Sequence, residues 1–427
     1  MKRKRAIEMI KMQRINRIFR IEAGLWIVAG IFLYLFRLPG AYLNSLSGLL
    51  FVIIGSGLAI LMTFSFFENV RNSKPEKVAE IAIKVMVNIS YMYILIFLVS
   101  DALNVLFRKM AVAPFFLFYL GTFLILLLAL PGYFRLVLME ANLVMRMFSM
   151  VIFFLLTISV PNTFQFGIFH VPEYAMLRLI AFFWSVFLLI IAMHYWGYRF
   201  PRFKINQAVN YWWLALLVFP RLIFIGFSAR SWSRLLSLPF TIRLSIPSTI
   251  GIRLTIANII FITVTVCFKE ELIFRFLFLN QIVDHIKGNS HVRILKSVLI
   301  TSVLFAIWHA RHFGVYPTPS VLLQMFSAFG IGMIFSVICL YTGTIWITVI
   351  LHSLFDLLLV DATSVQSPFT VSPNSFGVEF VVLTTTIQII VAVLAIYLTK
   401  PGPFEQTIRE NRLGSKPRLM TSLSLGK

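Results

Sequence analysis

Apolar runs long enough to cross a membrane recur along the whole chain, and this recurrence constrains the fold more than any other feature. A helix needs about 20 mainly apolar residues to span the hydrocarbon core of a bilayer, where its backbone polar groups must be bonded within the helix. Such runs lie near 22–37, 46–67, 85–107, 111–130, 147–169, 175–197, 208–227, 256–280, 296–312, 320–341, 344–360 and 378–399. The sequence therefore predicts an all-α fold, a polytopic transmembrane helical bundle of about 12 helices.

The composition agrees with a membrane protein. Of the 427 residues, 59% are hydrophobic and only 13% are charged. The formal net charge of +22 would suggest nucleic acid as the partner of a soluble chain, but most Lys and Arg fall between the apolar runs. This distribution is typical of positive-inside topology and of contact with anionic lipid headgroups. We expect anionic lipids as partners and no nucleic acid.

Both ends of the chain are basic. The first twenty residues hold eight Lys or Arg against the single acid Glu8, and a second basic cluster runs from Lys400 to Lys427. No small-residue cleavage pattern follows the first apolar run, so we interpret that run as a retained anchor. The positive-inside rule then predicts a multi-pass protein of the cell membrane with both termini in the cytoplasm.

The alternation of apolar runs and basic loops breaks between Arg221 and Arg253. This stretch carries several arginines without acidic neighbours and three prolines, Pro220, Pro239 and Pro247, which suits an interfacial or re-entrant connector. We therefore expect a boundary near residue 245. It separates an N-terminal transmembrane region, 1–245, from a second helical domain, 246–400, and a basic cytoplasmic tail, 401–427.

Two adjacent carboxylates and an arginine interrupt the apolar run near 256–280. On a helix, Glu271 and Arg275 stand four residues apart on one face and can pair, while Glu270 points about 100° away. A charge at the centre of a bilayer costs roughly 2.5 kcal/mol or more, so intramembrane ionisable residues usually face a protein interior or water. Glu270, which has no partner on its own helix, is therefore the better candidate for chemistry.

Two further polar pairs occur at helical spacing in the same half. Phe305 and His309 are four residues apart, and so are His352 and Asp356. A rise of about 1.5 Å per residue places Glu270, His309 and His352 roughly 15, 20 and 12 Å from one membrane face. The three side chains are therefore expected at similar depth.

Taken alone, each of these signals can be explained without catalysis. A single histidine in a membrane helix often only bonds a neighbouring helix, and a His-x-x-x-Asp pair would suit a proton relay. Phe305 alone would be an apolar side chain that packs in the protein core. Cys267 is expected to pack rather than to act as a nucleophile, because no base lies beside it in sequence.

In this order and spacing, the motifs Glu-Glu-x-x-x-Arg, Phe-x-x-x-His and His-x-x-x-Asp resemble those of the CAAX protease and bacteriocin-processing family, the Abi-type intramembrane glutamic endopeptidases. The resemblance covers roughly residues 245–400. It implies that Glu270 and His309 activate water and that His352 and Asp356 stabilise the oxyanion, with Glu271, Arg275 and Phe305 in support. The family's last motif ends in Asn or Asp, so Asp356 is an accepted variant that adds a potential charge.

The resemblance implies an endopeptidase that needs no cofactor and no metal, acting on a membrane-embedded peptide or protein in peptide maturation or bacteriocin self-immunity. Two glutamates and two histidines could also bind zinc, an alternative that the sequence leaves open but that we do not favour, since Arg275 competes for Glu271. A proton-coupled transporter is a hypothesis from another class. A non-catalytic immunity or scaffold protein of the same fold is a third.

Overall fold

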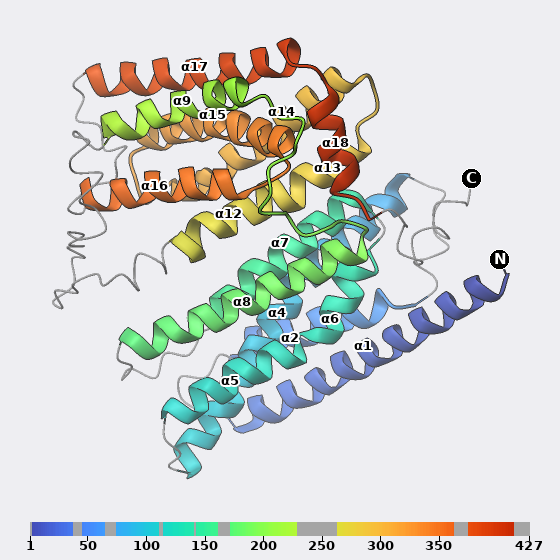
Figure 1. Ribbon diagram of the computed structural model, residues 1–427. Coiled ribbons are helices and arrows are strands. Elements are labelled where there is room, and N and C mark those ends of the chain that lie inside the picture. The colour runs from blue at the N-terminus through green and yellow to red at the C-terminus, as the bar shows by residue number, and fades with distance from the viewer. Residues whose placement is uncertain are drawn as a thin grey trace. The chain divides into compact units, whose positions relative to one another are not determined.

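The computed structural model describes residues 2–36, 45–64, 74–110, 114–140, 142–160, 171–228, 263–362 and 375–413. Across these ranges the chain forms helices, with two isolated β-bridges and no strand (Figure 1). This confirms the all-helical class. The helices fall into two compact units, which meet in sequence at Gly197 and Tyr198.

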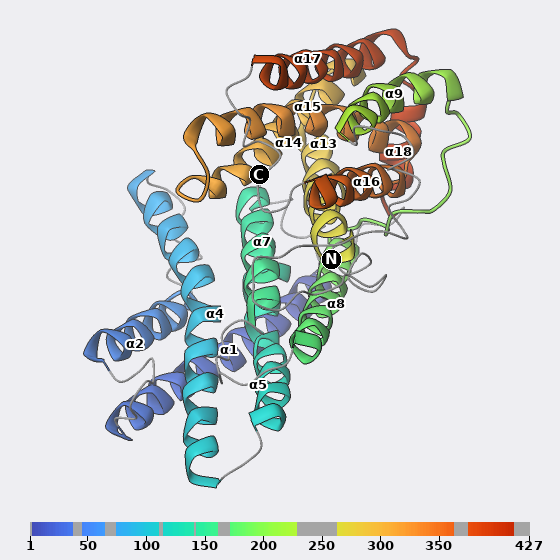
Figure 2. The same cartoon turned by 90° about the vertical axis from the view of Figure 1, so that its left-hand side faces the viewer.

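The first unit is a bundle of mostly long helices. The helices α1, α2, α4, α7 and α8 make successive pairwise contacts in that order (Figure 2). Helix α5 packs beside α4, and α6 packs beside α1 (Figure 1). Side-chain caps begin two of them, because Ser45 accepts from the Gly48 N–H of α2 and Asn142 from two N–H groups of α7. The elements are α1 (Lys2–Phe36), α2 (Leu46–Leu61), α4 (Lys74–Met110), α5 (Pro114–Leu128), α6 (Leu130–Gly132), η2 (Tyr133–Leu138), α7 (Leu143–Ser159) and α8 (Val171–Tyr195).

The polar centre of this unit is the Tyr91 hydroxyl. It lies 3.0 Å from a carboxylate oxygen of Glu22 on α1, and it accepts a hydrogen bond of 2.9 Å from the Gly132 N–H. A Cβ atom at Gly132 would stand 2.1 Å from the Tyr91 ring. The close approach of α4 and α6 therefore depends on glycine at position 132.

The second unit surrounds one central helix, α15 (Thr318–Thr342), which contacts α9, α14, α16 and α17 (Figures 1 and 2). Asn289 caps α14 by accepting from the Val292 N–H, and Gly343, with φ of 76°, ends α15 in the left-handed conformation. The other elements are α9 (Tyr211–Ser228), η4 (Thr263–Phe268), α12 (Lys269–Glu271), η5 (Leu272–Leu279), α13 (Asn280–His285), α14 (Ser290–Trp308), η6 (His309–His312), α16 (Trp346–Ala362), α17 (Ser375–Leu398) and α18 (Gly402–Glu410).

Six described helices are long and apolar enough to cross a membrane: Met12–Leu35, Val78–Leu103, Tyr119–Leu138, Ser290–His312, Thr318–Thr342 and Val378–Leu398. Five more are apolar but shorter. The chain is thus a membrane protein, but the predicted count of about twelve spans is not confirmed. One reason is the helix over 263–285, where the apolar run is broken by four ionisable side chains, those of Lys269, Glu270, Glu271 and Arg275.

The boundary between the two units lies between Gly197 and Tyr198, at the end of the apolar run near 175–197. The segment after Tyr198 is bonded to the second unit, because the Arg199 N–H donates to the Asn411 carbonyl oxygen and the Asn206 N–H to that of Thr342, each at 2.8 Å. The helix α9 packs on α15, α16 and α17 of the same unit. The boundary predicted near residue 245 lies outside the described residues and stays a prediction.

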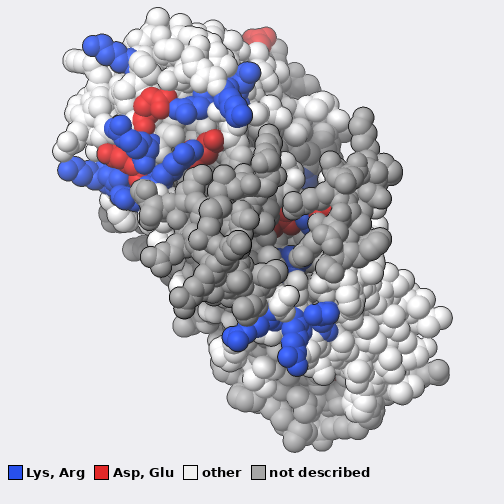
Figure 3. All heavy atoms as spheres, turned by 90° about the vertical axis from the view of Figure 1, so that its right-hand side faces the viewer, with Lys and Arg blue, Asp and Glu red and all other residues white. Residues whose placement is uncertain are grey.

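One end of the second unit is rich in charge. Arg202 pairs with Glu410 at 3.2 Å and Arg412 donates to Asp284 at 2.8 Å, and Figure 3 shows charged side chains gathered on the surface of this unit. Basic residues exceed acidic ones here, with Arg199, Arg202, Lys204, Lys287, Lys296, Arg409 and Arg412 all exposed. By the positive-inside rule this end should face the cytoplasm, and the orientation stays a prediction.

Glycines let α15 approach its neighbours closely, as is common between membrane helices. A Cβ at Gly332 would stand 2.9 Å from the Cα of Ser302 on α14, and a Cβ at Gly330 would stand 2.6 Å from a methyl of Thr385 on α17. The Ser302 atom belongs to the backbone and cannot turn away. Substitution at Gly332 must therefore separate the two helices.

We expect Gly332→Ala to destabilise the second unit by about 1–3 kcal/mol, the usual cost of overpacking a well-packed core. The measurement is the melting temperature of the purified protein in detergent. Gly57→Ala is the matched control, because nothing lies within 4 Å of a Cβ at that position of α2, and alanine favours a helix over glycine. Equal melting temperatures for the two variants would contradict the close packing of α14 on α15.

Candidate active site

The candidate site is built on the helix that runs without a break through η4, α12, η5 and α13, from Thr263 to His285. Its first and third parts are π-helical, a geometry that appears mostly in short stretches and often at functional sites. The sequence carries no signal for it. The helix buries Glu270, Glu271 and Arg275, which are 3%, 0% and 1% exposed.

Glu271 joins two other members of the predicted site. One of its carboxylate oxygens lies 3.2 Å from Nε of Arg275, which is the predicted pair on one helix face. The other lies 2.9 Å from Nδ1 of His352 on α16. The guanidinium of Arg275 also stacks over the ring of Phe305 at 4.5 Å. Glu271 therefore orients His352, a role that sequence reasoning missed because the two residues are 81 positions apart.

Glu270, which was expected to lack a local partner, finds its partners on other helices. Oε1 accepts from the indole N–H of Trp308 at 2.9 Å and lies 3.4 Å from Arg311. Oε2 faces Nε2 of His352 at 3.8 Å. Sequence reasoning gave no role to Trp308 or Arg311, although they flank His309 at the end of α14 and in η6.

His309 is held by its own helix. Its Nδ1 lies 2.9 Å from the carbonyl oxygen of Phe305, which can only accept, so Nδ1 carries the proton. The ring of Phe305 packs edge-on against His309, at 5.0 Å between centroids, and against His352, at 6.1 Å. Glu270 interacts electrostatically with both histidines. The Phe305 ring thus joins both histidines, and His352 faces Glu270, while their depth in a membrane stays a prediction.

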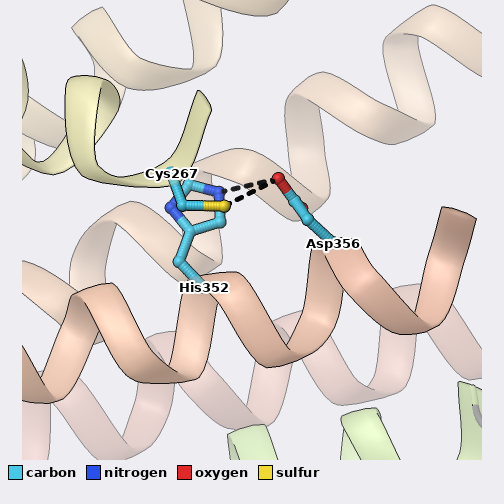
Figure 4. Close-up of side chains that lie close together, drawn as sticks. All are labelled: Cys267, His352 and Asp356. Carbon is cyan, nitrogen blue, oxygen red and sulfur yellow. Dashed lines mark hydrogen bonds and ion pairs between the residues drawn. The ribbon is translucent and has the colours of Figure 1, made fainter. Parts of the chain in front are cut away.

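His352 and Asp356 lie one turn apart on α16, and Cys267 reaches them from η4 (Figure 4). The Cys267 thiol donates to Oδ2 of Asp356 at 3.2 Å, and the same oxygen lies 3.9 Å from Nε2 of His352, too far for a hydrogen bond. Cys267 therefore has a polar partner 89 positions away in sequence, in addition to the packing role expected for it.

The ligand atoms of Cys267, His352 and Asp356 all lie within 4.8 Å of one another, as a metal-binding group would require. Among the described residues this is the set that fits a metal, and it differs from the two glutamates and two histidines considered from sequence. The Glu271 carboxylate already pairs with Arg275 through one oxygen and contacts Nδ1 of His352 through the other. Zinc at the two glutamates and two histidines is not tested by these contacts and stays an alternative.

Comparison with known protein families bears on this site directly. Residues 252–358 match the family model for type II CAAX prenyl endopeptidase Rce1-like proteins. This segment belongs to the Rce1-like family. The match confirms the resemblance indicated by the three motifs, over a shorter range than the 245–400 expected.

The Rce1-like segment contains all seven residues of the predicted site, from Glu270 to Asp356. It covers less than half of the chain and leaves α9, α17 and α18 outside. Comparisons with curated proteins and with solved structures gave no significant match. At the level of the family, the Rce1-like segment supports a membrane protease.

Proposed function

We propose that the protein is an intramembrane endopeptidase that cleaves a membrane-associated peptide by water activated at Glu270 and His309. The observation that carries the proposal is the environment of Glu270 inside the Rce1-like segment. Its carboxylate is 3% exposed, is held on one oxygen by Trp308 and Arg311, and presents the other oxygen to His352. A buried, oriented carboxylate is the group that water activation needs.

The reacting water is proposed to bind at Oε2 of Glu270. Oε2 of Glu270 and Nε2 of His352 are 3.8 Å apart, longer than a direct hydrogen bond and typical of groups that a water can bridge. Glu270 takes a proton from this water, and the water oxygen attacks the peptide carbonyl carbon. The proton then passes to the leaving amine as the C–N bond breaks. With its proton on Nδ1, His309 offers the lone pair of Nε2 as a second acceptor.

His352 is proposed to stabilise the oxyanion. Its Nδ1 is engaged by the Glu271 carboxylate, so donation to the oxyanion must come from Nε2, and donation from both nitrogens requires the imidazolium form. Carboxylates of Glu270, Glu271 and Asp356 lie at 3.8, 2.9 and 3.9 Å from the ring nitrogens and would stabilise that positive charge. Asp356, which accepts from Cys267, acts here through its charge and not as a donor.

Cleavage is expected to survive thorough chelation, because the proposed steps use only side chains of this chain. The measurement is the rate of product formation by purified protein after dialysis against a strong zinc chelator. Cys267→Ser is a useful companion variant, since it weakens the metal-binding group of Cys267, His352 and Asp356 but leaves Glu270 and His309 in place. Loss of activity on chelation with recovery on added zinc would contradict the metal-free mechanism.

The substrate is proposed to be a membrane-embedded or membrane-inserting peptide, with peptide maturation or bacteriocin self-immunity as the setting. The support is the location of the site among helices apolar enough to lie in a bilayer and the CAAX endopeptidase name of the matching family. The test is comparative membrane proteomics of cells that carry wild-type protein or the Glu270→Ala variant. The proposal expects peptides whose termini differ between the two.

Identical cleavage products in the two cells would exclude proteolysis as the function. If deletion of the whole protein nevertheless had a phenotype, a non-catalytic immunity or scaffold role would replace the proposal. The comparison of cleavage products is valid only if the Glu270→Ala variant is present in the membrane in the same amount as the wild-type protein. A neutral residue is easier to bury than a carboxylate, so we expect that amount.

A further inference from the structure

Three side chains beside the proposed reaction centre carry three different kinds of metal ligand. Cys267 offers a sulfur, His352 an imidazole nitrogen and Asp356 a carboxylate oxygen, and these atoms all lie within 4.8 Å of one another. They come from η4 and α16, two elements that pack against each other. In Figure 4 the thiol and the imidazole ring both face the same carboxylate oxygen. The fold therefore brings a mixed set of ligands to one point.

The spacing of these atoms is close to that of a tetrahedral zinc site. Bonds of about 2.3 Å to sulfur and about 2.1 Å to nitrogen and oxygen would place the sulfur about 3.6 Å and the nitrogen about 3.4 Å from the oxygen. In the protein, Sγ of Cys267 and Nε2 of His352 lie 3.2 and 3.9 Å from Oδ2 of Asp356. Each separation would have to change by about 0.5 Å or less to match these bond lengths.

The ring of His352 is already oriented as a metal ligand would be. Its Nδ1 lies 2.9 Å from a carboxylate oxygen of Glu271, whose other oxygen lies 3.2 Å from Arg275. Histidines that bind metals usually donate their second ring N–H to a carboxylate, which fixes the ring and makes the ligating nitrogen more basic. This arrangement leaves Nε2, the nitrogen that faces Asp356, as the ligand atom.

The kinds of ligand select the class of ion. Thiolate and imidazole suit zinc and similar transition metals, whereas magnesium and calcium prefer oxygen ligands alone. Cys267 and His352 are 0% and 6% exposed, but the Asp356 side chain is 24% exposed. An ion would therefore meet the carboxylate first. Three protein ligands leave the fourth tetrahedral position for a water molecule.

We propose that Cys267, His352 and Asp356 bind one divalent ion of the zinc type and that this ion inhibits cleavage. The S–H bond of Cys267 and the N–H bond at Nε2 of His352 break, bonds from both atoms to the metal form, and the two protons pass to solvent. Nε2 can then no longer donate to the oxyanion. Inhibition rests on the proposed function, whereas binding of the ion does not.

The binding test is a titration of the purified protein in detergent with Co²⁺, a spectroscopic substitute for Zn²⁺. The wild type should show the near-ultraviolet charge-transfer band of a cobalt–thiolate bond, complete at one equivalent. Zn²⁺ should abolish the band by displacing Co²⁺, and excess Mg²⁺ or Ca²⁺ should leave it unchanged. Absence of the band from the wild type would overturn the proposal.

Variants assign the band to this site. Cys267→Ser should lose it, while Cys339→Ser, the matched control, should keep it, because Cys339 is the other buried free cysteine and lies outside the metal-binding group. Asp356→Asn should weaken Co²⁺ binding by more than about tenfold, since changing even an outer partner of a metal ligand costs about 10–100-fold. A full band in Cys267→Ser would overturn the proposal. If Cys267→Ser does not fold, an unchanged affinity of Asp356→Asn would overturn it instead.

The inhibition test measures the cleavage rate with and without Zn²⁺, and takes the ratio within each protein. Zn²⁺ at about ten times its dissociation constant occupies most of the sites, so the rate of the wild type and of Cys339→Ser should fall about tenfold. The ratio for Cys267→Ser should stay near one at the same concentration. An equal fall in Cys267→Ser, or no fall in the wild type, would overturn the inhibitory role.

The two tests separate this inference from the proposed function. If no peptide is cleaved, the protease proposal fails, and the Co²⁺ titration still decides whether the metal site exists. If cleavage proceeds but the wild type gives no cobalt–thiolate band, the metal site alone is wrong.

Discussion

Replacing Glu270 with glutamine should lower the rate of peptide cleavage by about 100-fold to 10,000-fold, the range expected when a positioned general base is lost. Glutamine keeps the shape of the side chain and its carbonyl oxygen, so the hydrogen bond from Trp308 can be kept. It cannot accept a proton from water. The measurement is the rate of product formation on the peptide that comparative proteomics identifies, at equal amounts of folded protein.

Glu405→Gln is the control for the same chemical change elsewhere in the second unit. Glu405 pairs with Arg293 on α14 and lies in α18, outside the Rce1-like segment. Its loss should leave the cleavage rate near that of the wild type. A Glu270→Gln variant that cleaves at the wild-type rate would show that another group activates the water.

Replacing Arg275 with glutamine should destabilise the protein by about 3–5 kcal/mol, the usual cost of breaking a buried ion pair by removing one partner. Arg275 and Glu271 have fully buried side chains, so no water can take over the lost interaction. We expect little folded protein at the temperature of growth. The measurement is the fraction of expressed protein that elutes as a monodisperse species in detergent.

Arg311→Gln provides the matched comparison, because Arg311 also pairs with a glutamate of the site but its side chain is 44% exposed. Exposed ion pairs contribute about 0–1 kcal/mol, so this variant should be recovered in nearly normal amount. Adding Glu271→Gln to Arg275→Gln should restore part of the lost stability, since no unpaired charge remains. Equal yields of the Arg275→Gln and Arg311→Gln variants would contradict the importance of the buried pair.

Features that lie within one helix were predictable from sequence. The five apolar runs of the second half correspond to the helices over 263–285, 290–312, 318–342, 346–362 and 375–398, because spanning length is a local property. The Glu271 and Arg275 pair follows from i,i+4 spacing. The same rule placed His352 and Asp356 on one face, although their facing atoms are 3.9 Å apart and do not bond.

Features that depend on two helices were not predictable from one sequence. The bond from Trp308 to Glu270 joins residues 38 positions apart, and that from His352 to Glu271 joins residues 81 apart. Helical spacing describes only the faces of a single helix and says nothing about which faces meet. The π-helical turns around Glu270 have no residue signature, and α18 is too short and too polar to be found as an apolar run.

The division between α9, α17 and α18 and the Rce1-like segment has a consequence for how such proteins can diversify. The residues proposed for chemistry all lie between 252 and 358, whereas helices that pack against this stretch come from sequence outside the matched range. Mutations in those outer helices can alter what reaches the reaction centre while the groups that break the bond stay unchanged. Selectivity and chemistry can therefore change under separate selective pressures.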